Sequence, residues 1–307
     1  MLKWFKALVL AGSVGVLAAC SSGSGDKDNI VEIAQNDARF SILAEAVVAA
    51  GLADTLSNDG PFTVFAPTND AFAALLGELG VTKDQLLADK ALLTQVLTYH
   101  VLRGAVTRDA VPAGKALATV QGDIFKIDAS GSDLVITDGR NRTSKIIVTD
   151  LEASNGVVHA IDRVILPANR NIVETALGLP DFSILVEAVV AADLQGALSG
   201  TGPFTVFAPT NAAFAALLGE LGVTKDQLLA NKPLLTQVLT YHVLGSRVLK
   251  AEVPVGTPVA TLQGQTLTVT PALAIQDQRG RSANIVATDV LASNGVIHVI
   301  DKVILPQ

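Results

Sequence analysis

The sequence predicts an α+β fold, because one long unit occurs twice and each unit runs from helical to strand-like patterns. The stretch "GPFTVFAPTNDAFAALLGELGVTKDQLLADKALLTQVLTYHVL" begins at Gly60. Its copy begins at Gly202, 142 positions later, and differs at three places. This period is too long for a solenoid, whose repeats are a few tens of residues long. We therefore expect two whole domains in tandem, at residues 29–167 and 168–307.

The first half of each unit carries helical signals. The segment "FSILAEAVVAAG" has helical spacing and a stop at Gly51. "TNDAFAALLGELG" starts with capping residues and ends in glycine, and Thr82 and Gln85 have the spacing of a capping box. Between these segments, "FTVFAP" is a short apolar run closed by proline, which predicts a buried strand.

The second half of each unit alternates with a period of two. In "QTLTVTPALAIQD", Leu267 and Val269 fall on one face and threonines on the other. The pairs Asn155-Gly156 and Asn294-Gly295 are turn signals before the final strand. Helices followed by strands indicate an α+β domain rather than an alternating α/β domain.

The N-terminus predicts export and a lipid anchor. A basic start, "MLKWFK", and an apolar run too short to span a bilayer indicate a signal peptide over residues 1–19. The following "LAAC" contains the only cysteine, Cys20, and resembles the lipobox of bacterial lipoproteins, in which this cysteine is acylated. Residues 20–28 then form a lipidated cysteine and a flexible tether. Ser21, by the same resemblance, favours the outer membrane; the alternative is a secreted protein with a chance cysteine.

Charge and motifs restrict the possible functions. Removing residues 1–19 leaves 20 basic and 29 acidic residues, a net charge of −9. This argues against nucleic acid as a partner, which requires a basic surface. A single cysteine excludes an intrachain disulfide, and no metal-binding, nucleophile-elbow or phosphate-loop motif occurs. We expect no cofactor, no metal and no catalysis.

The segments "TVFAPTNDAFAALL", "YHVL" and "NGVVHAIDRVILP" resemble the motifs of the fasciclin domain, and all three recur in order in the second copy. The resemblance covers nearly all of Asn29–Pro306. It implies that each domain is a wedge-shaped β-sandwich with a cap of helices. It also implies a surface protein that serves adhesion or matrix contact without catalysis.

The histidines of the last strands, His159 and His298, are expected to be structural. His159 shares its face of the strand with apolar neighbours, while Asp162 falls on the other face, so the strand does not aim the two at each other. A buried imidazole between apolar residues usually bridges hydrogen-bonding groups. The family resemblance implies that His159 is a partner of the "TN" loop at Thr68-Asn69.

A tyrosine and a histidine are adjacent at Tyr99-His100 and again at Tyr241-His242. One interpretation is that both rings fix the end of a helix to the next strand, since every flanking residue is apolar. The other comes from the resemblance, because the Tyr-His motif of animal fasciclin proteins is regarded as receptor-contacting. No adjacent Ser, Cys or acidic residue would make His100 a general base.

The motif Asp-x-Arg-x-Arg occurs in both units while its neighbours change, as "DGRNR" and "DQRGR". Its arginines are two residues apart on an extended segment and can point the same way; they are Arg140 and Arg142, with the copies Arg279 and Arg281. Such a fork suits a carboxylate or sulfate on a glycan or a partner protein. The alternative is a solvated turn with a local Asp–Arg pair.

Together these features predict a membrane-anchored adhesion or binding protein, exported and held by lipid on Cys20, that contacts a surface or matrix protein or glycan. One alternative is a structural protein of the cell envelope. Another is a hydrolase of surface polymers with His100 or His159 as its base. The hydrolase would require a pocket that holds an imidazole, a nucleophile and oxyanion donors together.

Overall fold

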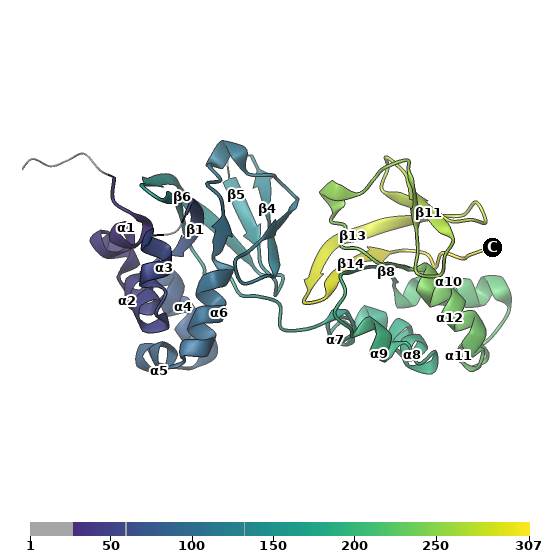
Figure 1. Cartoon of the computed structure of the whole chain (residues 1–307). Helices are drawn as coiled ribbons and strands as arrows, with labels where there is room; N and C mark the ends of the chain where they lie inside the picture. The colour runs from purple at the N-terminus through teal and green to yellow at the C-terminus, as the bar shows by residue number, and fades with distance from the viewer. Residues whose placement is uncertain (1–26, 59, 132) are drawn as a thin grey trace, which may run out of the picture.

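The computed structural model describes residues 27–58, 60–131 and 133–307, which form two domains of the same architecture (Figure 1). The predicted signal peptide and Cys20 lie outside these residues, so export and the lipid anchor stay predictions. Within the described residues, no helix is both long and apolar enough to cross a membrane. In each domain the helices gather on one side of a sheet (Figure 1).

The first domain begins with helices and ends with strands. Its helices are α1 (Ile30–Asn36), η1 (Ala38–Phe40), α2 (Ser41–Ala50), α3 (Ala53–Asn58), α4 (Asn69–Leu79), α5 (Lys83–Ala88), α6 (Lys90–Tyr99) and η2 (Arg108–Ala110). Its strands are β1 (Phe62–Pro67), β2 (Val101–Arg103), β3 (Ala116–Ala118), β4 (Ile124–Ser130), β5 (Asp133–Thr137), β6 (Thr143–Ala153) and β7 (Gly156–Ile161). The strand order of the sheet is β2-β1-β7-β6-β5-β4-β3.

The second domain repeats this order. Its helices are α7 (Ile172–Leu177), η3 (Pro180–Phe182), α8 (Ser183–Ala191), α9 (Gln195–Leu198), α10 (Asn211–Leu221), α11 (Lys225–Ala230), α12 (Lys232–Tyr241) and η4 (Lys250–Glu252). Its strands are β8 (Phe204–Pro209), β9 (Val243–Leu244), β10 (Pro258–Ala260), β11 (Thr266–Val269), β12 (Ala274–Gln276), β13 (Ser282–Ala292) and β14 (Gly295–Ile300). The strand order is β10-β11-β12-β13-β14-β8-β9. The predicted α+β fold is confirmed.

The predicted caps and turns hold the elements in place. The capping box of Thr82 and Gln85 is present at the start of α5. The Asn-Gly turns lie between the last two strands, and the glycine permits a close approach there. A Cβ on Gly156 would lie 2.0 Å from the carbonyl oxygen of Phe62, and one on Gly295 would lie 2.2 Å from that of Phe204. These glycines therefore allow β7 and β14 to run parallel to β1 and β8.

Each sheet curls around a second core. One apolar cluster of the first domain lies between the helices and the sheet and includes Phe72, Leu97 and Val158. A separate cluster, which includes Phe65 and Phe125, lies inside the curl, where their rings meet edge to face at 5.2 Å. The curl follows from β6, whose pairing with β7 shifts register twice. The second domain has the same two cores.

A small apolar cluster joins the two domains. Ile124 of β4 packs with Leu249, Leu291 and Val296 of the second domain. The larger clusters each lie within one domain. Each half therefore holds most of its own core.

We expect the fragment Asn171–Gln307 to unfold in one cooperative transition. Its free energy of unfolding should be about 1–3 kcal/mol lower than that of the same domain in the full chain, because Leu249 and Leu291 lose their apolar neighbour Ile124. Urea unfolding followed by circular dichroism measures both quantities. A broad, non-cooperative transition would show instead that the two halves form one interdependent fold.

Candidate binding site

Some of the residues that the sequence singled out, the motif Asp-x-Arg-x-Arg and the histidine of the Tyr-His pair, converge on one short segment of each domain. We call Val164–Pro167 and its copy Val303–Pro306 the exit segment, since it follows the last strand and has no strand partner. Four side chains bond to successive backbone groups of the first exit segment: Arg142 Nη2 to Val164 O at 2.8 Å, Ile165 N to His100 Nε2 at 3.1 Å, Leu166 N to Asp138 Oδ2 at 2.9 Å, and Arg140 Nε to Pro167 O at 3.3 Å. Side chains thus replace the missing strand neighbour.

Asp138 is the centre of this network. Its carboxylate, only 1% exposed as a side chain, accepts five hydrogen bonds. They come from two backbone N–H groups of the hairpin, from Nε and Nη2 of Arg142, and from Leu166 N. The alternative of a solvated Asp–Arg turn is therefore wrong, because the carboxylate is buried and connects the hairpin to the exit segment.

The expected arginine fork is not formed. Arg142 turns inward to Asp138 and the exit segment, and its Nη1 lies 2.9 Å from Glu78 Oε2. Arg140 remains exposed and uses only its Nε, toward Pro167. Its pKa is lowered by partial burial and then by the neighbouring charge of Arg142.

The hairpin of the second domain is built in the same way. Arg281 bonds to Asp277, Glu220 and Val303, while Arg279 donates from Nε to Pro306 O at 2.7 Å. The sequence motif therefore combines one structural and one exposed arginine in each copy, and only Arg140 and Arg279 are exposed for contact.

Both nitrogens of His100 are engaged in the interior. The ring is 1% exposed; Nδ1 lies 2.7 Å from Val96 O, and Nε2 accepts from Ile165 N. These partners require the neutral tautomer with the proton on Nδ1. Burial lowers the pKa of His100 to about 4. His242 has the same arrangement, with its pKa also lowered to about 4.

Tyr99 connects the helical part to the hairpin. Its side chain is fully buried, and its hydroxyl donates to Ile124 O at 2.7 Å and accepts from Gly139 N at 2.8 Å. Burial raises its pKa. Tyr241 is equally buried, and its hydroxyl donates to Thr266 O. A contact role for the Tyr-His pairs would thus require the surrounding elements to separate.

His159 is also buried, with the opposite tautomer. Its Nδ1 accepts from Asp150 N at 3.2 Å, and its Nε2 lies 2.8 Å from Val106 O, so the proton is on Nε2. Burial lowers its pKa. The implied partnership with the "TN" loop is not seen. Asn69 instead bonds to Ile42 N and to the carbonyl of Ala38, while His298 repeats the contacts of His159 in the second domain.

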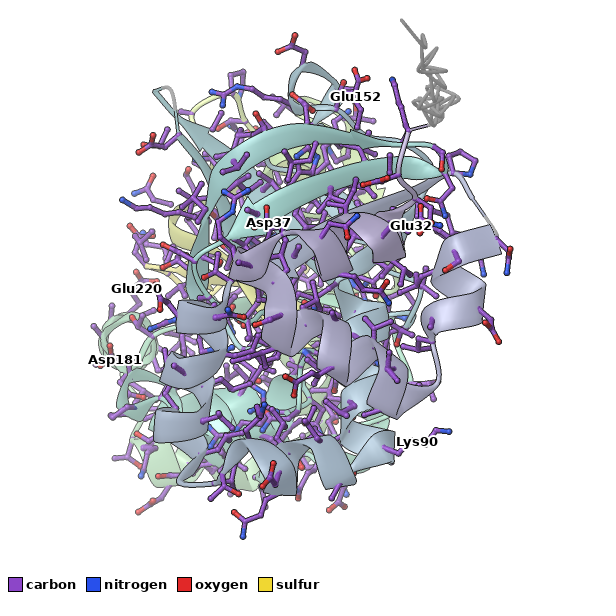
Figure 2. The ribbon with its side chains drawn as sticks, turned by 90° about the vertical axis from the view of Figure 1, so that its left-hand side faces the viewer. Glu32, Asp37, Lys90, Glu152, Asp181 and Glu220 are labelled. Carbon is purple, nitrogen blue, oxygen red and sulfur yellow. The ribbon has the colours of Figure 1, made fainter. Side chains whose placement is uncertain are left out.

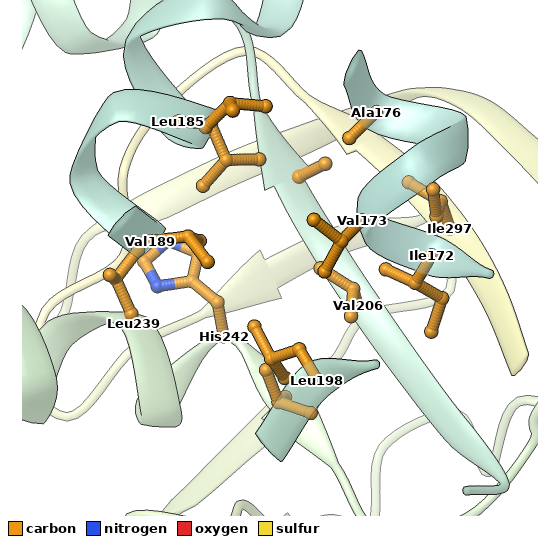
Figure 3. Close-up of a pocket in the computed structure, with 13 residues that line it drawn as sticks. Ile172, Val173, Ala176, Leu185, Val189, Leu198, Val206, Leu239, His242 and Ile297 are labelled. Atoms are coloured by element: carbon orange, nitrogen blue, oxygen red, sulfur yellow. The ribbon is translucent and has the colours of Figure 1, made fainter. Parts of the chain in front are cut away.

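An apolar pocket of about 30 Å³ lies between the helices and the sheet of the second domain (Figure 3). The labelled side chains of Ile172, Val173, Leu185 and Val206 surround it, with the His242 ring at one wall (Figure 3). A matching pocket of about 20 Å³ lies in the first domain. Such a volume holds about one water molecule, and the lining offers it few polar partners. Both are packing voids rather than ligand sites.

Polar contacts hold the two domains together in addition to the apolar cluster. The amide of Asn141 donates to Leu291 O at 3.0 Å and accepts from Leu291 N at 2.6 Å, as a neighbouring strand would. Lys126 Nζ lies 2.9 Å from Asp289 Oδ2, and the Asp289 side chain is 3% exposed. Burial would lower the pKa of Lys126, but its contacts with Asp289 and Asp128 outweigh this effect and raise it.

These docking contacts were not foreseen from the sequence, although a comparison of the copies contains a signal. Asn141 corresponds to Gly280 in the repeated hairpin. Lys126 pairs with Ala116 as Thr268 pairs with Pro258, so Lys126 corresponds to Thr268. Both positions differ between the copies, as expected for a contact that each copy makes with a different surface.

A polar cleft of about 420 Å³ lies between the domains, next to these contacts. Three segments line it: the first hairpin with Arg140 and Asn141, the linker with Asn169 and Arg170, and the second domain with Thr175, Gly178, Leu179, Val290 and Leu291. In the described part of the chain, no three His, Cys, Asp or Glu side chains group as metal ligands would. The cleft offers several polar side chains to a ligand, among them Arg140, Asn141 and Arg170.

The motifs, the repeated network and the fold define a known class of domain. The sequence model of the fasciclin domain matches residues 38–167 and 180–306, so the chain belongs to the fasciclin domain family. Pig transforming growth factor-beta-induced protein ig-h3 is 32% identical over 82% of this chain and 36% of its own length. Protein sll1483 of Synechocystis is 51% identical over 44% of this chain and 73% of its own length.

The chain spans about a third of the length of ig-h3. Among solved structures, the FAS1 domain pair from the insect cell adhesion molecule fasciclin I is 21% identical, with a TM-score of 0.44. That match covers 88% of this chain and 98% of the insect chain.

Proposed function

We propose that this protein is a membrane-anchored, extracytoplasmic adhesion protein that binds a surface or matrix polymer through its two fasciclin domains. Fasciclin domains are associated with adhesion and binding in homologous proteins. The resemblance of "LAAC" to a lipobox supports an anchor at Cys20. A lipid anchor followed by a short tether would hold both domains close to the membrane surface.

The observation that carries the proposal is the state of the four histidines. In each described ring one nitrogen lies at a backbone carbonyl and the other accepts a backbone N–H; the rings are His100, His159, His242 and His298. A general base needs a free lone pair within reach of its substrate. These rings have none free, which counts against the alternative of a hydrolase with His100 or His159 as its base and supports recognition as the role of the domains.

The test compares cells that carry the wild-type chain with cells that carry Cys20→Ala. We expect the wild-type protein to stay in the membrane fraction after a salt wash and to make the cells adhere to isolated surface polysaccharide or matrix. Cys20→Ala should release the protein and abolish adhesion, because the anchor is lost. Ser22→Ala, two residues away, serves as the matched control and should behave as the wild type.

Two results would contradict the proposal. If the Cys20→Ala protein still partitions with the membrane, the prediction of a lipid anchor at Cys20 is wrong. If wild-type cells adhere no better than cells without the protein, the proposal of an adhesive function is wrong.

A further inference from the structure

The cleft between the domains combines positive charge with the absence of acidic lining. Arg140 and Arg170 approach it from the hairpin and from the linker. Its other polar lining residues are Asn141, Asn169 and Thr175. The chain without residues 1–19 carries a net charge of −9, so the positive charge of the cleft contrasts with the negative charge of the chain as a whole.

Both arginines keep guanidinium N–H groups that are available to a ligand. Arg140 uses only Nε, and within the described residues neither it nor Arg170 forms an ion pair with a carboxylate. The guanidinium of Arg170 lies against Gly178, where a Cβ would be 3.0 Å from Nη1. The glycine thus allows the guanidinium to lie along the wall of the cleft.

The two copies differ in charge on this surface. Three of the positions that line the cleft from the second domain and its linker have acidic counterparts in the first copy, while Asn169 corresponds to Lys27. Arg170 corresponds to Asp28, Leu179 to Asp37 and Leu291 to Glu152. Asp37 and Glu152 lie on the outward face of the first domain, away from the cleft (Figure 2). At these three positions the second copy thus has one base and two apolar residues where the first copy has acids.

We propose that the interdomain cleft binds an acidic saccharide, with Arg140 and Arg170 holding its carboxylate or sulfate group. Arginine suits such groups because its planar donors match their oxygens. The inference rests on the proposed adhesive function and names the class of polymer that the adhesion would engage.

The rest of the lining favours a sugar over a bare anion. The amides of Asn141 and Asn169 can exchange hydrogen bonds with hydroxyl groups. Leu179 and Val290 add apolar surface on which the carbon face of a ring can pack. A volume of about 420 Å³ also lies in the range of small-molecule sites, about 300–1,000 Å³.

The test titrates the full chain with an oligogalacturonate, a sulfated heparin-type oligosaccharide, a neutral dextran oligomer and inorganic phosphate, by calorimetry at low and physiological salt. We expect at least one acidic oligosaccharide to bind, more weakly at the higher salt, and the dextran not to bind. The two acidic probes distinguish carboxylate from sulfate as the recognised group. Phosphate, which lacks the ring, should bind at least about tenfold more weakly.

Arg140→Gln and Arg170→Asp should each lower the affinity for the acidic oligosaccharide about tenfold or more, since each removes a charge-assisted contact. Arg170→Asp restores the residue of the first copy. Arg279→Gln is the matched control, because this arginine has the same backbone contact as Arg140 but does not line the cleft. It should bind as the wild type.

The outcomes separate this inference from the proposed function. If cells adhere but neither acidic oligosaccharide binds, or if Arg279→Gln weakens binding as much as Arg140→Gln, the cleft is not the site. Equal affinity for phosphate and oligosaccharide would also overturn the inference. If the oligosaccharide binds as expected but cells do not adhere, the cleft site stands and the adhesive function fails.

Discussion

Asp138→Ala should unfold the first domain under conditions where the second domain stays folded. The substitution removes the acceptor of five hydrogen bonds and leaves the Arg142 guanidinium without its main partner in a largely buried place. Removing one member of a buried ion pair costs about 3–5 kcal/mol, a large part of the stability of a domain. Calorimetry of the full chain should show the two melting transitions moving apart.

The repeat supplies the controls for this prediction. Asp277→Ala should destabilise the second domain in the same way, because Asp277 accepts from Arg281 and from Leu305 N. Asp70→Ala introduces the residue that the second copy has at Ala212. Asp70 is exposed, so this change should alter stability by about 0.5 kcal/mol or less. An Asp138→Ala protein with an unchanged melting profile would show that the network contributes little.

Stability should fall steeply as the pH is lowered from about 6.5 toward 4. His100 and His242 have pKa values of about 4 in the folded protein, against 6.5 in their ordinary state. Between these values the unfolded chain binds protons that the folded chain does not, so acid favours unfolding. Each pKa unit corresponds to about 1.4 kcal/mol, so each ring should contribute a loss of about 3 kcal/mol.

Other buried groups act in the same direction. Burial lowers the pKa of His159 and His298. Each of these rings therefore also lowers the free energy of unfolding of its domain as the pH falls below about 6.5. For Asp277, burial opposes ionisation, but backbone N–H groups and Arg281 outweigh it and lower the pKa. The stability from Asp277 is therefore present above its unfolded pKa and is lost as the pH falls through the folded value.

Urea unfolding at several pH values from 7 to 4 measures the pH dependence. His100→Gln keeps a hydrogen-bonding side chain without a proton that titrates in this range, so the first domain should lose part of its pH dependence. The second domain, with His242 intact, is the internal control. A stability that is flat between pH 6.5 and 4 would mean that these rings are not buried as described.

Most of the fold could be predicted from the sequence, because helices, strands and turns are indicated by local sequence patterns. Periodicity and caps identified α4 and α5, and the Asn-Gly pairs identified the turn before β7. The role of Asp138 depends on Leu166, 28 residues away, and no local pattern reveals such a contact. The expected fork failed for the same reason, since Arg142 finds its partners across the fold.

The candidate site was less accessible to sequence reasoning than the fold. Arg140 was singled out, but as one of a pair with Arg142, whereas in the structure it lines the same cleft as Arg170 from the linker. The relation between the two domains decides this neighbourhood. That relation depends on Asn141 and Lys126, which look like ordinary polar surface residues in the sequence.

The contact of Asn141 with Leu291 joins two different surfaces of two domains with the same fold. A head-to-tail contact of this kind, if every domain carried both surfaces, would add copies without limit and produce a filament. The chain does not carry both surfaces twice. The second hairpin has Gly280 where the first has Asn141, and the first domain has Glu152 where the second has Leu291. The free hairpin therefore lacks the amide side chain of Asn141, and the free surface of the first domain lacks the apolar side chain of Leu291, so neither end repeats this contact in full.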